Sequence, residues 1–257
     1  MSRKLLITAF LAALALSGCK PSNKAAPAAW GYSGDGAPAL WSTLNSDYAT
    51  CGSGTSQSPI DIVTSGLTAG THGAISVSYN KGELAETNNG HTLEVVYPSG
   101  STMTVNGVTY NLLQFHFHAY SENTIDGVEA KMEAHFVHST ASGHETGGSL
   151  AVLALLVDEG TENASLKDVF DNFPPIEVAD STIVGKEVNA ADILPTDLSY
   201  YQFTGSLTTP PCTEGVEWYV LKNRITVSAA QLAQFTVLMD GNHRPVQSLN
   251  GRTVTVN

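Results

Sequence analysis

The stretch QFHFH at residues 114–118 alternates polar and aromatic side chains without a break. In a β-strand successive side chains point to opposite faces, so His116 and His118 share one face and the phenylalanines share the other. By itself a His-x-His pair is weak evidence, because histidines on strands often only pack or face solvent. The stretch EAHFVH at 133–138 alternates in the same way and adds His135, with a carboxylate beside it. Three such imidazoles can bind one metal ion, at about 2.0–2.1 Å for zinc.

Length and composition indicate one globular, β-rich domain. The chain has 257 residues, of which 42% are hydrophobic and 14% charged, enough for a single large domain with a substantial core. The formal net charge is −12, and no basic run follows the first few residues. Nothing in the chain would therefore neutralise phosphates, which excludes a nucleic-acid partner.

Residues 1–19 are predicted to be an export signal of the lipoprotein type. Arg3 and Lys4 precede an apolar run at 5–16 that is too short to span a bilayer comfortably. The run ends in LSGC at 16–19, which resembles a bacterial lipobox, so Cys19 is the predicted lipidated first residue of the mature chain. The alternative is an ordinary secretory signal with an incidental cysteine.

A small, polar and proline-containing segment at 20–29 is predicted to be a flexible tether, so the folded domain would span 30–257. Lys20 directly after the lipidated cysteine favours the outer membrane, and the predicted location is the periplasm with a lipid anchor. Cys51 and Cys212 then lie in a compartment that permits disulfides. A disulfide between them is the prediction, and two free buried thiols are the alternative.

Short alternating runs between turn dipeptides are typical of antiparallel hairpins. From residue 75 to 108 the turn dipeptides are Asn89-Gly90, Ser99-Gly100 and Asn106-Gly107. The apolar run at 150–157 predicts a central strand buried on both faces. Helices are predicted only at 165–173 and at 228–239, where a capping box opens the helix. The predicted fold is one mostly-β domain around a large, twisted, mainly antiparallel sheet with short peripheral helices.

Nine stretches resemble the α-class carbonic anhydrases and occur in that family's order. They are WGY (30–32), QSPIDI (57–62), NNGH (88–91), QFHFH (114–118), SENTIDG (121–127), EAHFVH (133–138), GSLTTPPC (205–212), EWYVL (217–221) and NHRPVQ (242–247). The resemblance covers the chain from Trp30 to Arg252. It implies a zinc lyase that reversibly hydrates carbon dioxide to bicarbonate and a proton, by attack of zinc hydroxide on CO₂ with a histidine as proton shuttle.

The resemblance assigns the metal ligands and their supports. His116, His118 and His135 would be three neutral ligands of Zn²⁺. By strand alternation Gln114 should orient His116 and Glu133 should orient His135, while a backbone carbonyl near Asn242 would serve His118. His138 points to the opposite face and is predicted to be a hydrogen-bonded core residue.

The resemblance also implies the substrate side of the site. Thr208 would accept the hydrogen bond of the zinc hydroxide and donate its own proton to an ionised Glu122, and Thr209 would line the substrate side. Because CO₂ is apolar, it needs an apolar wall rather than a charged clamp. The residues that match that wall are Val137, Val152, Leu207 and Trp218.

His91 matches the family's proton shuttle, since a histidine titrates near neutral pH. Tyr32, Asn89 and Thr209 match the polar residues that order the intervening waters. The alternative for His91 is an exposed histidine on a turn. Two further positions depart from the family. Asn123 stands where a structural histidine is usual, and Glu94, usually asparagine or glutamine, is predicted to raise the pKa of His91.

Two other classes of protein share part of this pattern. A cupin with iron or manganese also carries His-x-His followed by a glutamate, here Glu122, but no second cupin motif follows Gly127. A non-catalytic relative that acts as a binding module would typically lack a zinc ligand, whereas all three histidines are present. The predicted partners are CO₂ and bicarbonate, with a membrane contacted only through the anchor. The sequence does not decide whether the chain forms a homodimer.

Overall fold

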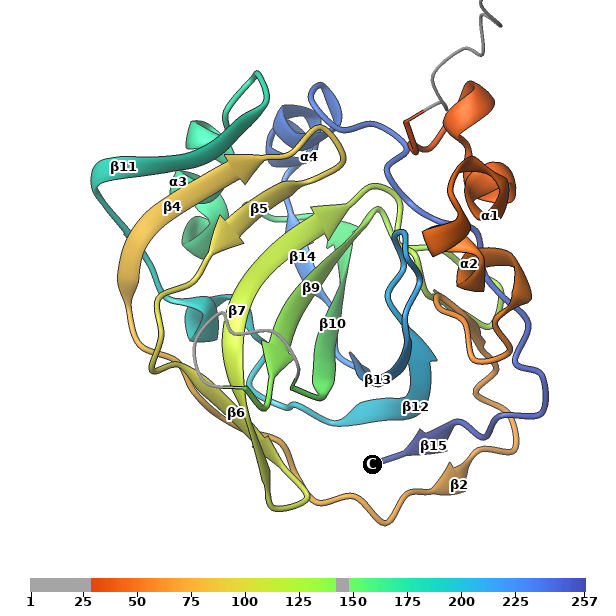
Figure 1. The fold of residues 1–257 in the computed structure, drawn as a ribbon. Coiled ribbons are helices and arrows are strands. Elements are labelled where there is room, and N and C mark those ends of the chain that lie inside the picture. The colour runs from red at the N-terminus through yellow and green to blue at the C-terminus, as the bar shows by residue number, and fades with distance from the viewer. Residues whose placement is uncertain (1–28, 142–147) are drawn as a thin grey trace, which may run out of the picture.

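The computed structural model describes residues 29–141 and 148–257 (Figure 1). The predicted signal, the lipobox at Cys19 and nearly all of the tether lie outside the described residues. Within the described part of the chain, no helix is long and apolar enough to cross a membrane.

One twisted sheet of 13 strands organises the molecule. Its main order is β11-β4-β5-β7-β9-β10-β13-β12-β15-β2, while β14 joins β10, and β6 joins both β3 and β7. The strands are β2 (Thr68–Ala69), β3 (Ser76–Ser78), β4 (Gly82–Asn88), β5 (Leu93–Val96), β6 (Thr102–Val105), β7 (Val108–His118), β9 (Met132–Ser139), β10 (Leu150–Glu159), β11 (Val178–Val188), β12 (Tyr200–Ser206), β13 (Glu214–Leu221), β14 (Ile225–Val227) and β15 (Thr255–Val256). The pairs β10–β13, β10–β14 and β15–β2 are parallel and the others antiparallel, which confirms the predicted fold class.

Smaller elements surround the sheet. The strands β1 (Asp61–Ile62) and β8 (Thr124–Ile125) form a separate parallel pair. The short helices α1 (Trp41–Leu44) and α2 (Thr50–Ser53) belong to the N-terminal arm, drawn in red and orange in Figure 1. Helices α3 (Lys167–Asn172) and α4 (Ala229–Thr236) pack together at the end of the sheet where β4 and β5 lie.

Both predicted helices are present, each shorter than expected. A 3₁₀ turn at Ala164–Leu166 precedes α3. The predicted capping box opens α4: the Ser228 hydroxyl accepts from the Gln231 N–H at 3.2 Å, and the Gln231 side chain accepts from the Ser228 N–H at 3.1 Å. Two of the four unpaired N–H groups at the start of the helix region are thereby satisfied.

The central strands separate two apolar cores by simple alternation. On β10, Leu153 and Leu155 face the larger core with Phe115 of β7, while Val152 and Ala154 face a smaller one with Trp218. The predicted strand at 150–157 is therefore buried on both faces, as expected. His138 of β9 lies in the larger core, where its Nε2 is 2.7 Å from the Tyr79 hydroxyl, which confirms its structural role.

Two local features of the sheet differ from the expectations. The turn at Ser99-Gly100 is not a hairpin, because β5 and β6 both pair with β7 at different points along it and not with each other. In β7 the register slips between Leu112 and Gln114, so one extra residue forms a bulge. The bulge lets Leu112 face the same core as Phe115, although regular alternation would send them to opposite faces.

Candidate metal centre and active site

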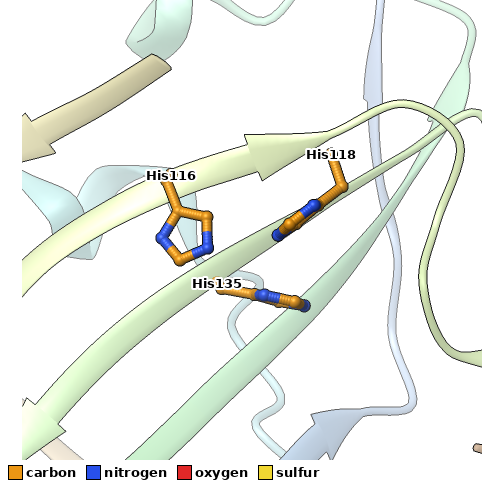
Figure 2. Close-up of side chains that lie close together, drawn as sticks. All are labelled: His116, His118 and His135. Carbon is orange, nitrogen blue, oxygen red and sulfur yellow. The ribbon is translucent and has the colours of Figure 1, made fainter. Parts of the chain in front are cut away.

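Three histidine rings converge on one face of the sheet (Figure 2). His116 and His118 come from the end of β7, and His135 comes from β9 directly opposite His116. One nitrogen of each ring lies within 4.8 Å of the corresponding nitrogens of the other two. Among the described residues this is the one group of three or more potential metal ligands so arranged. Strand alternation and the register between β7 and β9 together bring the three side chains to one point.

Backbone and side-chain acceptors fix the two rings of β7 from outside. The Nδ1 atom of His116 is 2.8 Å from Oε1 of Gln114, and Nδ1 of His118 is 2.7 Å from the carbonyl oxygen of Asn242. Because each oxygen can only accept, Nδ1 carries the proton in both rings. The lone pair of each histidine therefore lies on Nε2, the atom that faces the cluster.

Glu133 serves the third ring. Its Oε1 lies 3.0 Å from Nε2 of His135, although without the alignment of a full hydrogen bond. The same carboxylate accepts from the N–H groups of Glu122 and Asn123, at 2.7 and 2.8 Å, and from the Asn123 side-chain amide at 2.7 Å. Asn123 therefore holds Glu133 through both its backbone N–H and its side-chain amide. This arrangement leaves Nδ1 of His135 to face the cluster.

Burial keeps all three rings neutral. It lowers the pKa of His118 to about 4, and burial together with the neighbouring rings lowers the pKa of His116 and of His135 well below the ordinary value. Nε2 of His118 is buried with no hydrogen-bond partner, a costly state for a polar atom. Three neutral nitrogens, one of them orphaned, are the donor set that zinc takes in catalytic sites, and they fit that ion.

Glu122 lies beside the cluster. Its Oε1 accepts from the Arg244 N–H at 2.8 Å, and its Oε2 lies 3.6 Å from Nε2 of His118 and 3.9 Å from Nδ1 of His135. Burial raises the pKa of Glu122 to about 8, while the Thr208 hydroxyl and the Arg244 N–H lower it. A cation held by the adjacent histidines would act in the same direction, since opposite charges within about 4–6 Å favour the ionised carboxylate.

The loop that carries Thr208 is fastened at both ends. The predicted disulfide joins Cys51 to Cys212, which are 161 positions apart in sequence. The Cys212 N–H donates to the Thr209 carbonyl at 2.8 Å, and the Trp218 indole donates to the Ser206 carbonyl at 3.0 Å. These contacts hold Thr208, which is buried, in a fixed place next to Glu122.

An apolar wall adjoins the cluster. Val152 on β10 is the register partner of Val137 on β9 and of Trp218 on β13. Val152 and Trp218 are buried in the smaller core, and Val137 and Leu207 pack against it. The Trp218 ring meets the His135 ring edge to face with centroids 4.9 Å apart. The wall therefore begins beside the His135 ring.

His91 lies apart from the cluster, on the turn at residues 89–92 between β4 and β5, called here the shuttle turn. Its ring stacks on Trp30 of the N-terminal arm, with centroids 3.6 Å apart and planes at 15°. The Asn89 side chain accepts from the N–H groups of His91 and Thr92, both at 2.9 Å, so it shapes the turn itself. The Tyr32 hydroxyl is buried without a hydrogen-bond partner, and burial raises the pKa of that phenol. The sequence did not predict the stacking of His91 on Trp30, because it showed only that the N-terminal arm contains aromatic residues.

The prediction that Glu94 raises the pKa of His91 is wrong. Burial lowers the pKa of His91, and the carboxylate that opposes this effect is that of Glu177. Glu94 is instead the register partner of His116. It therefore lies on the metal face of the sheet, whereas His91 turns toward the arm.

The geometry defines a β-sheet enzyme with a mononuclear site of three neutral histidines and an apolar wall. The eukaryotic-type carbonic anhydrase family model matches residues 36–257. Similar curated proteins include a carbonic anhydrase of Pectobacterium atrosepticum, 41% identical over 246 residues that cover 95% of this chain and 98% of that protein. One of Neisseria gonorrhoeae is 43% identical over 227 residues, covering 88% and 86%.

Solved structures agree with the sequence comparison. The α-carbonic anhydrase from Thermovibrio ammonificans, in complex with the inhibitor sulfanilamide, aligns with a TM-score of 0.83 at 38% identity, covering 89% of this chain and 99% of that one. The chain belongs to the eukaryotic-type carbonic anhydrase family, so the resemblance is confirmed. Reversible hydration of CO₂ is the reaction of that family, and zinc is the cofactor that fits the three histidines.

Proposed function

We propose that this chain catalyses the reversible hydration of carbon dioxide through the residues described above, with His116, His118 and His135 as zinc ligands. The observation that carries the proposal is the convergence of three neutral imidazole nitrogens, each ring held by one outer acceptor, beside an apolar wall. When bound, zinc supplies the Lewis acid that activates water at neutral pH. The chain's own residues supply the ligands, the orientation and the proton path.

Thr208 and Glu122 orient the attacking water. Thr208 lies against the Glu122 carboxylate and lowers the pKa of that group. With the hydroxyl proton of Thr208 directed to Glu122, the hydroxyl oxygen is left to accept a hydrogen bond from the water. That water then donates one proton to Thr208 in a hydrogen bond. A lone pair on its oxygen is therefore directed away from Thr208 and toward the substrate. The direction of this chain depends on Glu122 remaining an acceptor, which its bond from the Arg244 N–H supports.

The apolar wall holds the substrate. Val137, Val152 and Trp218 follow one another across three strands, with Leu207 beside them, and they offer CO₂ contact without hydrogen bonds. Thr209, half-buried on the Thr208 loop, lines the same side. Bicarbonate is charged and loses its hydration at such a wall, which favours its release.

His91 carries the proton away. Its imidazole accepts a proton at a ring nitrogen, relayed by water from the metal centre, and releases it to buffer from the rim. Tyr32, Asn89 and Thr209 are the polar groups that we assign to the ordering of the intervening waters. The stacking on Trp30 supports this role, because it leaves the edges of the imidazole free for water.

The decisive test is stopped-flow CO₂ hydration by the chain from residue 30 onward, with and without a zinc chelator, together with metal analysis. We expect one zinc per chain and an activity that the chelator abolishes and added zinc restores. Iron or manganese in place of zinc would indicate a cupin-type enzyme. Stoichiometric zinc without hydration would indicate a binding module of the same family.

We also propose that the chain is exported and anchored by a lipid at Cys19 in the periplasm, on the outer membrane. The lipobox LSGC at 16–19 and Lys20 after the cysteine support this. Metabolic labelling with a tagged palmitate, followed by membrane fractionation, tests it: Cys19→Ser should lose both label and membrane association. Sedimentation of the mature protein decides between a monomer and a homodimer.

A further inference from the structure

Glu177 lies beside the shuttle turn, although it is distant from it in sequence. The first residue of β11, which follows Glu177, pairs with Asn88 at the end of β4. The Asn88 side chain donates to the Pro174 carbonyl at 2.8 Å and accepts from the Gly90 N–H at 3.0 Å. One side chain therefore ties the segment before β11 to the turn at 89–92.

The carboxylate of Glu177 rests on the backbone next to His91. A Cβ atom built on Gly90 would lie 2.7 Å from Oε1 of Glu177 and 3.0 Å from its Cδ. Gly90 has a φ of 80°, which the turn requires and which also favours glycine. Glycine here thus serves two purposes: it permits the turn, and it lets a carboxylate approach the residue before His91.

The hollow beside His91 has no charged residue in its lining among the described residues. The hollow on its Trp30 side is lined by Ala29, Trp30, Leu44, Asn45, Ser46 and Tyr48. Glu94 of β5 is paired with His116 on the metal face. Within the described residues, Glu177 is the charged group that acts on His91, where it opposes the effect of burial on the pKa of the imidazole.

A proton shuttle in this place has a specific difficulty. Stacking on Trp30 removes water from one face of the imidazole, and desolvation disfavours its charged form. An imidazole that resists protonation is a poor acceptor for the proton that each turnover produces. A carboxylate at the rim stabilises the charged form without blocking the ring edges.

We propose that Glu177 is a positioning residue of the proton shuttle, whose fixed negative charge stabilises the imidazolium of His91 at the rim. The inference rests on the proposed role of His91. The proton moves from water to a ring nitrogen of His91 and then to a buffer base, and none passes to Glu177. No bond to Glu177 forms or breaks.

The experiment measures the His91 imidazole directly, by NMR titration of histidine-labelled, zinc-loaded protein. In Glu177→Gln we expect the pKa of His91 to fall by about 0.5, the size of one screened opposite charge at close range. We expect kcat in weak buffer above neutral pH to fall about twofold, with kcat/KM unchanged. Glu83→Gln is the matched control, because it removes the same charge from an exposed position at the other end of β4.

Salt and a double variant sharpen the test. Raising the ionic strength from 0.01 to 1 M shortens the screening length from about 30 to about 3 Å, so it should lower the pKa of His91 in the parent and change it less in Glu177→Gln. In a His91→Ala background, Glu177→Gln should leave kcat unaltered.

An unchanged His91 pKa in Glu177→Gln, even with a lower melting temperature, would mean that Glu177 only anchors the turn and would overturn the proposal. The same loss of kcat in the His91→Ala background would overturn it as well. Failure of the shuttle role itself is distinguishable, because His91→Ala alone would then leave kcat intact while the NMR titration still reports on Glu177.

Discussion

The same side chain occupies two opposite environments in this molecule. The three clustered histidines sit on strands, and an acceptor lies beside the outer nitrogen of each ring. His91 sits on a turn, half-buried against Trp30, and among the described residues no protein group bonds its ring nitrogens. Burial lowers the pKa in both places, but far more in the cluster.

The difference follows from what each histidine has to do. A metal ligand has to stay neutral and keep one lone pair aimed at a fixed point, so strands and outer acceptors suit it. A shuttle has to gain and lose a proton in every turnover and to exchange it with water, so a turn at the rim suits it. The four predictions below test this contrast, beginning with the most rigid part.

His118→Ala should have the largest effect. Its Nε2 is buried with no hydrogen-bond partner, and two remaining imidazoles hold zinc far more weakly than three. We expect loss of stoichiometric zinc after dialysis and loss of hydration, both larger than the roughly 10–100-fold effect of changing a supporting acceptor. Metal analysis checks it, and a variant that keeps one zinc per chain would remove His118 from the ligand set.

Gln114→Ala should have the next largest effect. It removes the acceptor that is 2.8 Å from Nδ1 of His116, so the ring is free to rotate and to change its tautomer. We expect zinc affinity to fall by about 10–100-fold, measured by competition with a chelator. Asn111→Ala is the control: it lies on the same strand, but its amide bonds the Ala141 carbonyl, so zinc affinity should not change. Equal losses in both variants would show a general loosening of β7.

The histidine cluster could be predicted from the sequence, because strand alternation determines which side chains share a face. The alternation in QFHFH and EAHFVH predicted the cluster, and with it Gln114, Glu133 and Val137. The partners of Thr208 and the wall across three strands required the family resemblance, since they depend on contacts between distant segments.

The surroundings of His91 could not be predicted from the sequence in the same way. The stack of His91 on Trp30 and the approach of Glu177 to Gly90 join segments whose positions depend on loops. Without them, Glu94 was the nearest carboxylate in sequence, and it was given the wrong role. The bulge that follows Leu112 was missed for a similar reason, because the alternation changes phase at a single residue while the pattern on either side of it stays regular.

His91→Ala should have a smaller and separable effect. The attack on CO₂ does not involve this residue, so kcat/KM should be nearly unchanged. In weak buffer kcat should fall by about tenfold or more, since general acid–base groups typically contribute at least that much. Imidazole at tens of millimolar, about the concentration at which a free base competes for the proton, should restore much of the loss. Unaltered kcat in weak buffer would make His91 a simple turn residue.

The smallest effect is a shift of the pH profile of kcat. The sign of this shift follows from the burial and the charges around His91. His91 accepts a proton only when neutral, so kcat should rise with pH through the pKa of its imidazole. Burial beside Trp30 lowers that pKa from the ordinary value of 6.5, and the Glu177 charge only partly opposes it. The midpoint should therefore lie below 6.5 in the parent enzyme. Because folding lowers this pKa, protonation of His91 should also cost stability as the pH falls below the unfolded value.

Trp30→Ala tests the cause of that shift. It restores water to the face of the imidazole while leaving Glu177 in place, so the midpoint should move up to the ordinary value or above it. Zinc content serves as the control, because the ring contacts of Trp30 are with Tyr32, Trp41 and His91, and none of these is a proposed zinc ligand. A midpoint above 6.5 in the parent enzyme would mean that the Glu177 charge, not burial, has the larger effect on the pKa of His91. A midpoint in Trp30→Ala that does not move would mean that the stack has no influence on the proton, and that His91 differs from the clustered histidines only in its distance from the metal centre.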